Sequence, residues 1–403
     1  MRWACLPLPA LLLAASLLGL GLSIAASAGQ ERVRTTSPAI ALKNLDYGVE
    51  RARLMLDARP GDATLLSAYV DALLTRVRFL DSFDDFEPAL AATARALELQ
   101  PQDPRIRMER ARVLQALHRF DEAGMLLDTT AAGLQSTPSP LADALGPTLD
   151  LQRQTIALAR GDARGVLAHL ADGSLSGNRF ADGTLAGAAL AALGRREEAD
   201  AALAEALVDW DHITPFAIAW IEFQRGEVWV GVDDARAEQH YTTALDYMPA
   251  YVTARVHLAE LLMARGALQA AIDLLTPVAD GANPEPAARL AEFLAARGET
   301  QAAQRRAAQA ERGWSALLER HPLAFADHAA EFWLGAGADP GRALVWARRN
   351  HANRPTERAL ALLLDAQMAA GQADCGRLAT AAAPSSPSLA ESVSRLEAAC
   401  SGP

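Results

Sequence analysis

Paired amphipathic segments joined by a glycine recur along the chain, and this recurrence constrains the fold most. Residues 252–279 read VTARVHLAELLMARGALQAAIDLLTPVA, where Gly266 separates two segments that each carry an apolar stripe. Residues 286–311 follow the same plan, with Gly298 at the turn. The plan also recurs in residues 104–134, with the turn at His118-Arg119, and in residues 184–211, with Gly194 at the turn. One such helix pair cannot bury its apolar stripe alone, so the pairs must stack on one another.

The composition agrees with a helical chain. Ala, Leu and Arg are strong helix formers, and aromatic residues make up only 5% of the 403 residues. We therefore predict an all-α protein. The net charge of −11 argues against nucleic acid or an anionic membrane surface as the main partner.

The recurring units resemble tetratricopeptide repeats, which are helix hairpins of about 34 residues. The resemblance rests on small residues in the first helix, alanines in the second helix and prolines that close the unit. The small residues of the first helix are Ala111, Gly187, Ala259 and Ala291. The alanines of the second helix are Ala123, Ala199, Ala271 and Ala303, and the closing prolines are Pro101, Pro249, Pro322 and Pro355. The resemblance covers roughly residues 40–375. It implies a right-handed α-solenoid of stacked helix hairpins with a concave groove.

The regularity of the repeat sets the expected boundaries along the chain. Residues 77–88 carry an insertion, and the run ADGSLSGNRFADGT at 171–184 is typical of a loop. We expect a signal peptide or anchor at 1–28, a linker at 29–37, repeats at 38–137, a degenerate repeat with a loop at 138–183, repeats at 184–375 and a C-terminal cap at 376–403.

The stretch FQRGEVWVGVDD at 223–234 tests the helical interpretation, because its alternating valines are also typical of a strand. Apolar residues at steps of three and four from Pro215 favour a helix. Gly231 then follows the end of that helix, and Asp233 or Asp234 caps the next one. Since this unit is about four residues longer than the repeat, we predict a first helix that is one turn longer than usual.

The N-terminus has the pattern of an export signal. Arg2 precedes an apolar run from Leu6 to Ile24, and Ala26-Ser27-Ala28 is typical of a cleavage site. The run is also long enough to be a membrane anchor if it is retained. We therefore expect an exported protein that is periplasmic or associated with the cell envelope.

Cysteine usage is consistent with export. Cleavage after Ala28 would remove Cys5 and leave Cys375 and Cys400. Two cysteines in an exported chain predict one disulfide, and the alternative is a pair of buried thiols.

No catalytic or cofactor-binding motif appears in the sequence. It lacks the nucleophile elbow, the zinc-protease motif, the phosphate-binding loop and the dinucleotide fingerprint. We expect no enzyme, no cofactor and no metal. The alternative is a metal-handling or enzymatic accessory protein, in which His328 and Glu331 share a helix face and act with His321 or His351.

The family resemblance also implies which side chains face the groove. The candidates are Arg105, Arg112, Glu222, Trp229, Glu260, Glu292, Phe325, His328 and Phe332. This groove would be basic at its early end, then acidic, then aromatic, which suits a peptide or protein partner. The alternative is that the charges are merely solvated and the aromatic residues pack between repeats. We expect a non-enzymatic scaffold with a protein or peptide partner, no nucleic acid, and membrane contact only through an uncleaved N-terminus.

Overall fold

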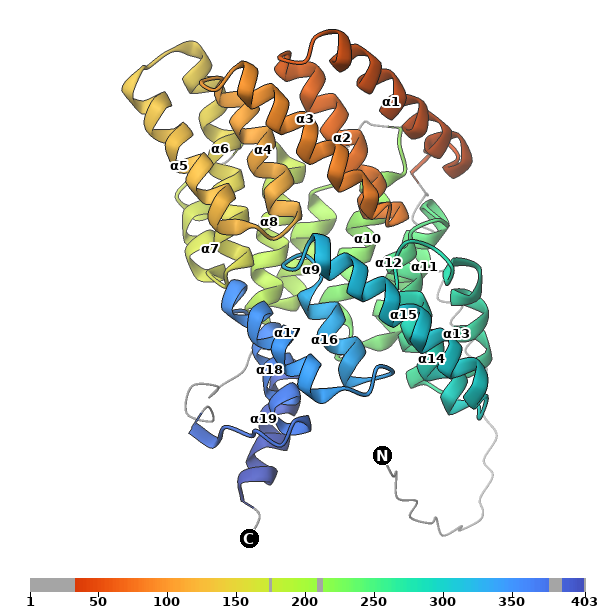
Figure 1. Cartoon of the computed structure of the whole chain (residues 1–403). Coiled ribbons are helices and arrows are strands. Elements are labelled where there is room, and N and C mark those ends of the chain that lie inside the picture. The colour runs from red at the N-terminus through yellow and green to blue at the C-terminus, as the bar shows by residue number, and fades with distance from the viewer. Residues whose placement is uncertain (1–32, 174–175, 209–212, 377–385, 402–403) are drawn as a thin grey trace, which may run out of the picture. The chain divides into compact units, whose positions relative to one another are not determined.

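Helix hairpins follow one another through the chain (Figure 1). The computed structural model describes residues 33–173, 176–208, 213–376 and 386–401, and every regular element within these ranges is helical. The chain divides into Met1–Arg34 and Thr35–Pro403, and the helices of the described residues lie in the second unit. The prediction of an all-α solenoid is confirmed. None of the helices in the described ranges is both long and apolar enough to cross a membrane.

The N-terminal helices are α1 (Pro38–Ala58), α2 (Ala63–Leu80), the 3₁₀ turn η1 (Phe83–Asp85), α3 (Phe86–Leu99), α4 (Pro104–Ala116), α5 (Phe120–Ser136), α6 (Pro140–Ala159), α7 (Ala163–Ala171), α8 (Arg179–Ala192) and α9 (Arg196–Glu205). The C-terminal helices are α10 (Phe216–Trp229), α11 (Asp234–Tyr247), α12 (Val252–Ala264), α13 (Leu268–Leu275), the 3₁₀ turn η2 (Thr276–Val278), α14 (Glu285–Ala296), α15 (Thr300–Arg320), α16 (Ala326–Leu334), α17 (Pro340–Asn353), α18 (Glu357–Ala369) and α19 (Pro387–Cys400).

One residue with a positive φ follows the first helix of each repeat. Such a residue lets the chain reverse direction and bonds the last carbonyls of the helix. The residues are Asp81, His118, Gly161, Gly194, Gly231, Gly266, Gly298, Ala338 and Gly371. The turns predicted at Gly194, Gly266 and Gly298 and at His118 are therefore confirmed.

The predicted closing prolines stand where the second helix of a repeat ends. Pro101 follows the C-cap of α3, and Pro249 follows the C-cap of α11. Pro322 and Pro355 take the same place after α15 and α17. Proline stops these helices because it has no N–H to continue the ladder and disfavours helical geometry in the residue before it.

The stretch at 223–234 is helical as far as Trp229, as the apolar spacing predicts. Gly231 has a φ of 76°, and the side chain of Asp233 accepts a hydrogen bond from Arg236 N at 3.1 Å at the start of α11. The prediction of an extra helical turn is wrong. α10 has 14 residues, the same number as α8, so the additional residues precede Phe216 rather than extend the helix.

The degenerate region contains two helices of very different length. α6 has 20 residues and α7 has nine. The expectation of a loop throughout 171–184 is wrong from Arg179 onward, where α8 begins. The side chain of Asn178 caps this helix by accepting a hydrogen bond from Ala181 N at 3.2 Å, and this local bond outweighs the loop-like composition.

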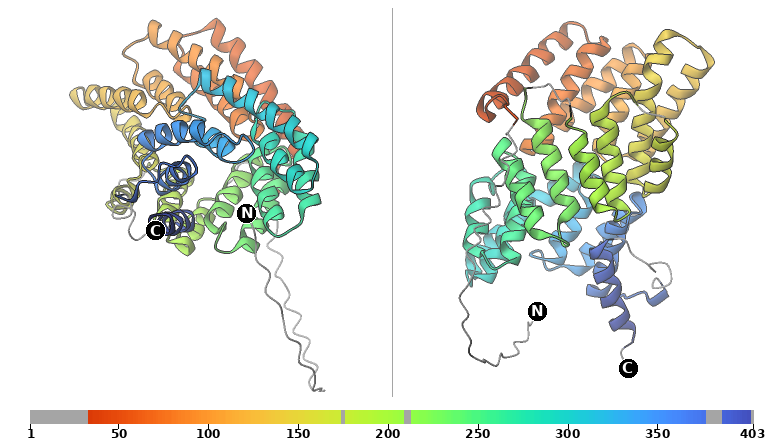
Figure 2. Two further views of the ribbon diagram at one scale, coloured as in Figure 1. Left: turned by 60° about the horizontal axis from the view of Figure 1, so that its bottom comes forward. Right: turned by 180° about the vertical axis from the view of Figure 1, so that it is seen from behind.

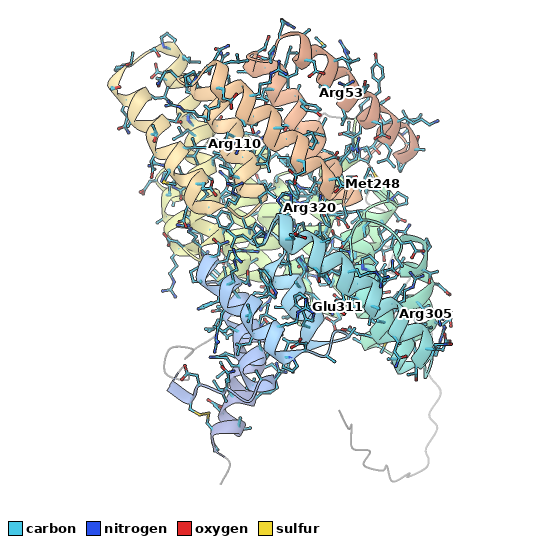
Figure 3. The ribbon with its side chains drawn as sticks, in the orientation of Figure 1. Arg53, Arg110, Met248, Arg305, Glu311 and Arg320 are labelled. Carbon is cyan, nitrogen blue, oxygen red and sulfur yellow. A yellow bond between two sulfur atoms is a disulfide. The ribbon has the colours of Figure 1, made fainter. Side chains whose placement is uncertain are left out.

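The insertion at 77–88 brings the early repeats into contact with the late ones. Asn283 Nδ2 donates to Asp81 Oδ2 at 2.7 Å, although 202 positions separate them in the sequence. Arg320, at the end of α15, pairs with Asp84 at 2.7 Å (Figure 3). The rings of Phe83 and Phe325 meet edge to face with centroids 4.8 Å apart.

One continuous hydrophobic core includes residues from both the early and the late repeats. It joins side chains of α1–α4 with side chains of α14–α18. Figure 2 shows the blue C-terminal helices returning beside the orange N-terminal helices. The stacked hairpins of residues 35–403 therefore curl until the late repeats pack against the early ones.

The C-terminal helix α19 packs on α18 and is linked back to the preceding segment. Leu389 and Leu396 of α19 join a small apolar cluster with Ala361 and Leu364 of α18. Cys375 and Cys400 form a disulfide, visible as the yellow bond in Figure 3. The covalent link closes a loop that contains α19 and holds this helix against the solenoid.

Candidate functional site

Ion pairs connect the first helices of successive repeats on their inner faces. Glu227 of α10 lies 2.9 Å from His257 Nδ1 of α12. On the same face of α12, Glu260 pairs with Arg289 of α14 at 2.6 Å. Each pair therefore joins one repeat to the next.

The series continues into the late repeats. Arg289 pairs with Glu331 of α16 at 3.4 Å, and Glu331 pairs with Arg358 of α18 at 3.4 Å. We call the whole series the charge ladder; its members are Glu227, His257, Glu260, Arg289, Glu331 and Arg358.

The sequence builds the ladder from a basic and an acidic residue three positions apart. α12 carries His257 and Glu260, and α14 carries Arg289 followed by Glu292. Residues at i and i+3 share one face of a helix, so each helix presents both signs of charge inward. His257 and Arg289 also stand at the same distance before their turn glycines, which places them at equivalent positions of the repeat.

The ladder residues stay ionised although burial disfavours their charged forms. Burial would lower the pKa of His257, but Glu227 outweighs it and raises the pKa to about 9. Burial would likewise raise the pKa of Glu227, but His257 brings it down to about 2. The hydroxyl of Tyr241 also donates to Glu227, and burial together with this carboxylate raises the pKa of Tyr241. The pair is therefore ionised at neutral pH beside a neutral tyrosine.

All six ladder residues line a cavity of about 840 Å³, which we call the central cavity. Its remaining walls come from α8, α9, α10, α18 and α19. Arg395 of α19 lines it and pairs with Asp365 of α18 at 2.8 Å. The disulfide-linked C-terminal helix thus forms part of the wall.

The charges around the central cavity balance. Its basic residues are Arg196, His257, Arg289, Arg358 and Arg395, and its acidic residues are Glu227, Glu260, Glu331, Asp365 and Glu391. Because the two sets are equal in number, the cavity does not select a ligand by the sign of its net charge. It offers alternating donors and acceptors to a polar ligand.

The nine predicted groove residues lie in several different environments. Glu260 lines the central cavity. Glu292 lines a separate cavity of about 480 Å³ and faces Arg289 at 3.4 Å. Arg112 lines a third cavity and pairs with Asp71 and Glu109.

Two predicted groove residues are engaged in local ion pairs. Arg105 is exposed, and its guanidinium is held 2.6 Å from Asp103, the N-cap of α4. Glu222 faces His240 at 2.7 Å and Arg225 at 3.1 Å, in a half-buried network between α10 and α11. Neither residue lines the central cavity.

The expectation of exposed aromatic groove residues is wrong. Trp229 is 3% exposed and lies under the guanidinium of Arg236, 3.4 Å from the ring centre. Phe325 and Phe332 are also buried, and Phe325 forms part of the contact with Phe83. Aromatic rings bury a large apolar area between packed helices, so these three rings stabilise the core rather than line a binding surface.

His328 is half-buried beside carboxylates. Glu285 lies 3.3 Å from its Nδ1, and ligand atoms of Glu285, His328 and Glu331 lie within 4.8 Å of one another. Burial would lower the pKa of His328, but Glu285 and Asp327 raise it to about 10. A protonated imidazole is not a metal ligand, and Arg289 already pairs with Glu331. A divalent cation would have to displace both the proton and the guanidinium.

Most of the ladder was missed by sequence reasoning. The prediction assigned one inward position to each of α12 and α14, at Glu260 and Glu292. The residue three positions earlier, His257 or Arg289, shares that face and pairs with the neighbouring repeat. Repetition of a basic–x–x–acidic pattern in successive first helices is the signal that would have revealed them.

Stacked hairpins with a charged inner cavity define an α-helical repeat protein of the solenoid type. A tetratricopeptide repeat model matches residues 235–280, which span α11 to α13, so this part of the chain is similar to a tetratricopeptide repeat. The resemblance of the sequence to the tetratricopeptide repeat superfamily is confirmed. A comparison with characterised proteins finds no match.

Several solved structures are similar to the chain at low identity. A chain of the APC/C hetero-tetramer Cut9–Hcn1 is 16% identical with a TM-score of 0.45, covering 82% of this chain and 60% of that one. Human IFIT1, solved as a dimer with m7Gppp-AAAA, is 13% identical with a TM-score of 0.45, covering 90% and 78%. The TPR domain of P58(IPK) is 14% identical with a TM-score of 0.30, covering 90% and 96%. The chain therefore spans less than two thirds of the Cut9–Hcn1 chain.

Proposed function

We propose that the protein is a non-enzymatic scaffold of the cell envelope that binds a segment of a peptide or protein partner in its central cavity. The observation that carries this proposal is the charge ladder, which runs through five successive repeats along one wall of that cavity. A polypeptide segment presents regularly spaced amides and charged side chains, and a wall of alternating donors and acceptors can pair with both.

The volume of the cavity favours a segment over a folded domain. About 840 Å³ lies within the range of roughly 300–1,000 Å³ that is typical of ligand pockets. A chain terminus or a short loop can enter such a space, whereas a folded partner could contact only its rim.

Two features support a location outside the cytoplasm. The N-terminal sequence has a basic residue, an apolar run and a small-residue cleavage pattern. The disulfide between Cys375 and Cys400 is the kind of bond that persists in oxidising compartments. N-terminal sequencing of the protein from isolated envelopes tests this point. A start at Gly29 indicates cleavage, a retained Met1 indicates an anchor, and recovery from the cytoplasm alone contradicts export.

Site-specific photo-crosslinking tests the binding proposal. Val230 lines the central cavity and is 38% exposed, so a photoreactive amino acid at this position faces a bound segment. Val345 of α17 is 59% exposed, lies outside the central cavity and provides the matched control. We expect one defined adduct from position 230 in cells, identified by mass spectrometry, and none from position 345. Equal labelling at both positions, or no adduct at position 230, contradicts the proposal.

The second candidate function is metal handling by Glu285, His328 and Glu331, and their proximity favours it. Metal analysis of the purified protein separates it from the scaffold. Stoichiometric metal that is lost in His328→Ala would support metal handling, whereas no bound metal in the wild type would leave the scaffold as the better account.

A further inference from the structure

The cavity that Arg112 lines, of about 390 Å³, differs from the central one in its charge. We call it the basic cavity; its walls come from α2, α4, α5 and α6, with Arg354 from the end of α17. Three guanidinium groups line it, those of Arg78, Arg112 and Arg354, against the single carboxylate of Asp71. Asp71 already pairs with Arg112.

Arg78 is the group that makes the basic cavity unusual. Among the described residues, no carboxylate forms an ion pair with it, and its guanidinium lies over the ring of Trp220, 5.2 Å from the centre. The surrounding protein lowers the pKa of Arg78, and the neighbouring charge of Arg112 lowers it further. The side chain is nevertheless exposed, and it lines the cavity.

The other polar groups of the cavity supply more donors than acceptors. Gln115 Nε2 and Arg354 Nε find no hydrogen-bond partner within the described chain. Burial lowers the pKa of His118 to about 4, so its imidazole is neutral and adds no positive charge. His118 Nδ1 lies 3.2 Å from the carbonyl of Leu323 and donates its proton there. Asp71, the carboxylate of the lining, pairs with Arg112, and Arg354 pairs with Asp327 at 3.2 Å, so Arg78 is the guanidinium of this cavity that has no ion pair among the described residues.

Apolar side chains share the wall with Thr75 and Thr155. Leu74, Ala116, Phe120 and Ala159 line the same space as the arginines. A bare inorganic ion would leave these side chains facing water, whereas an anion with an apolar body would cover them. The volume is within the range of roughly 300–1,000 Å³ for small-molecule sites.

We propose that the basic cavity binds a small organic anion, in which a carboxylate or phosphate group bonds Arg78 and an apolar body lies against Leu74 and Phe120. Guanidinium groups bind such oxyanions through two parallel hydrogen bonds, which gives Arg78 the partner that the chain itself does not supply. This site is separate from the central cavity and does not depend on the binding of a polypeptide there.

Isothermal titration of the full chain with phenyl phosphate tests the site. Inorganic phosphate tests the anion alone, and benzyl alcohol tests the apolar body alone. We expect phenyl phosphate to bind most tightly, phosphate more weakly and benzyl alcohol not at all. Equal binding of benzyl alcohol and phenyl phosphate, or no binding of phenyl phosphate, overturns the proposal.

Variants of one residue assign the binding to the basic cavity. Because a charge-assisted hydrogen bond is lost, Arg78→Gln should weaken phenyl phosphate binding at least about tenfold. Arg78→Lys, which keeps the charge without the planar fork, should retain part of the affinity. Arg305→Gln is the matched control, because Arg305 is exposed on α15, away from the basic cavity (Figure 3). Unchanged affinity in a folded Arg78→Gln protein, checked by circular dichroism, contradicts the assignment.

A peptide distinguishes a free small anion from an acidic group on a partner protein. A ten-residue peptide with a central phosphotyrosine carries the same phenyl phosphate group on a polypeptide. We expect it to bind more weakly than phenyl phosphate, since its backbone must also enter the cavity. Tighter binding of the peptide would overturn the small-molecule assignment.

Discussion

Gly226 permits the closest approach of two helices beside the charge ladder. A Cβ atom added to Gly226 of α10 would overlap Cε1 of Tyr241 on α11 and lie 2.5 Å from Cδ1 of the same ring. The Tyr241 ring is fully buried, and Phe223 and His257 flank it with centroids 5.7 and 5.8 Å away. Its hydroxyl is also bonded to Glu227. The ring therefore has no free direction in which to move.

The change Gly226→Ala should destabilise the protein by about 1.5–5 kcal/mol. Overpacking of a filled core costs about 1–3 kcal/mol, and loss of the Tyr241 hydrogen bond to a charged carboxylate adds about 1.5–3 kcal/mol where the ring is displaced. Replacing a helical glycine by alanine recovers about 1 kcal/mol. Because the clash involves ring atoms and not the end of a flexible chain, the unfavourable effects outweigh the gain.

Chemical denaturation followed by far-UV circular dichroism measures the effect. Gly124→Ala is the matched control, since Gly124 also lies inside a helix but a Cβ added there would meet no atom within 4 Å. We expect Gly124→Ala to raise the denaturation midpoint, by about 0.5–1 kcal/mol of unfolding free energy, and Gly226→Ala to lower it. If both substitutions stabilise the protein, the close packing of α10 on α11 is refuted.

Three further predictions concern the ladder, the insertion and the C-terminus. Because the pKa of His257 is raised to about 9 in the folded protein, its contribution to stability is complete below about pH 6.5 and is lost as the pH rises through about 9. The lowered pKa of Glu227 makes its contribution decline below about pH 4.5. In thermal melts at a series of pH values, His257→Gln should therefore flatten the loss of stability at alkaline pH. Phe83→Ala should cost about 2 kcal/mol and increase amide hydrogen exchange in both α2 and α15; faster exchange in α2 alone would contradict the contact. Breaking the Cys375–Cys400 bond by Cys400→Ser should remove up to about 3 kcal/mol and speed exchange in α19 first, and peptide mapping without reductant should link the two cysteines in the wild type.

The local features of the fold were predictable because single residues determine them. Gly194, Gly266 and Gly298 mark turns, since few other residues adopt a positive φ without cost. Pro101 and Pro249 mark helix ends for an equally local reason. The alternation of valines around Trp229 did not mislead the prediction, because the apolar spacing from Pro215 is helical over a longer range.

The contacts between repeats were not predictable in the same way. Asp81 and Ala338 adopt positive φ values at turns where glycine is the usual residue, so residue type alone did not mark them. The burial of Trp229 depends on Arg236 from the next helix, which covers the ring. Sequence periodicity assigns a residue to a helix face but does not reveal what a second helix places over that face.

The insertion at 77–88 links the fold to the proposed function. Its contacts through Asp81, Phe83 and Asp84 hold the late repeats against the early ones, and the inner face borders two partly open cavities. An open solenoid can accept a whole helix along its length, whereas here α19 also forms a wall of the central cavity. Under the proposed function, the insertion and the disulfide-linked helix would limit the ligand to a short segment or a small molecule. Under the proposed function, the choice of ligand would depend on this packing as well as on the residues of the inner face.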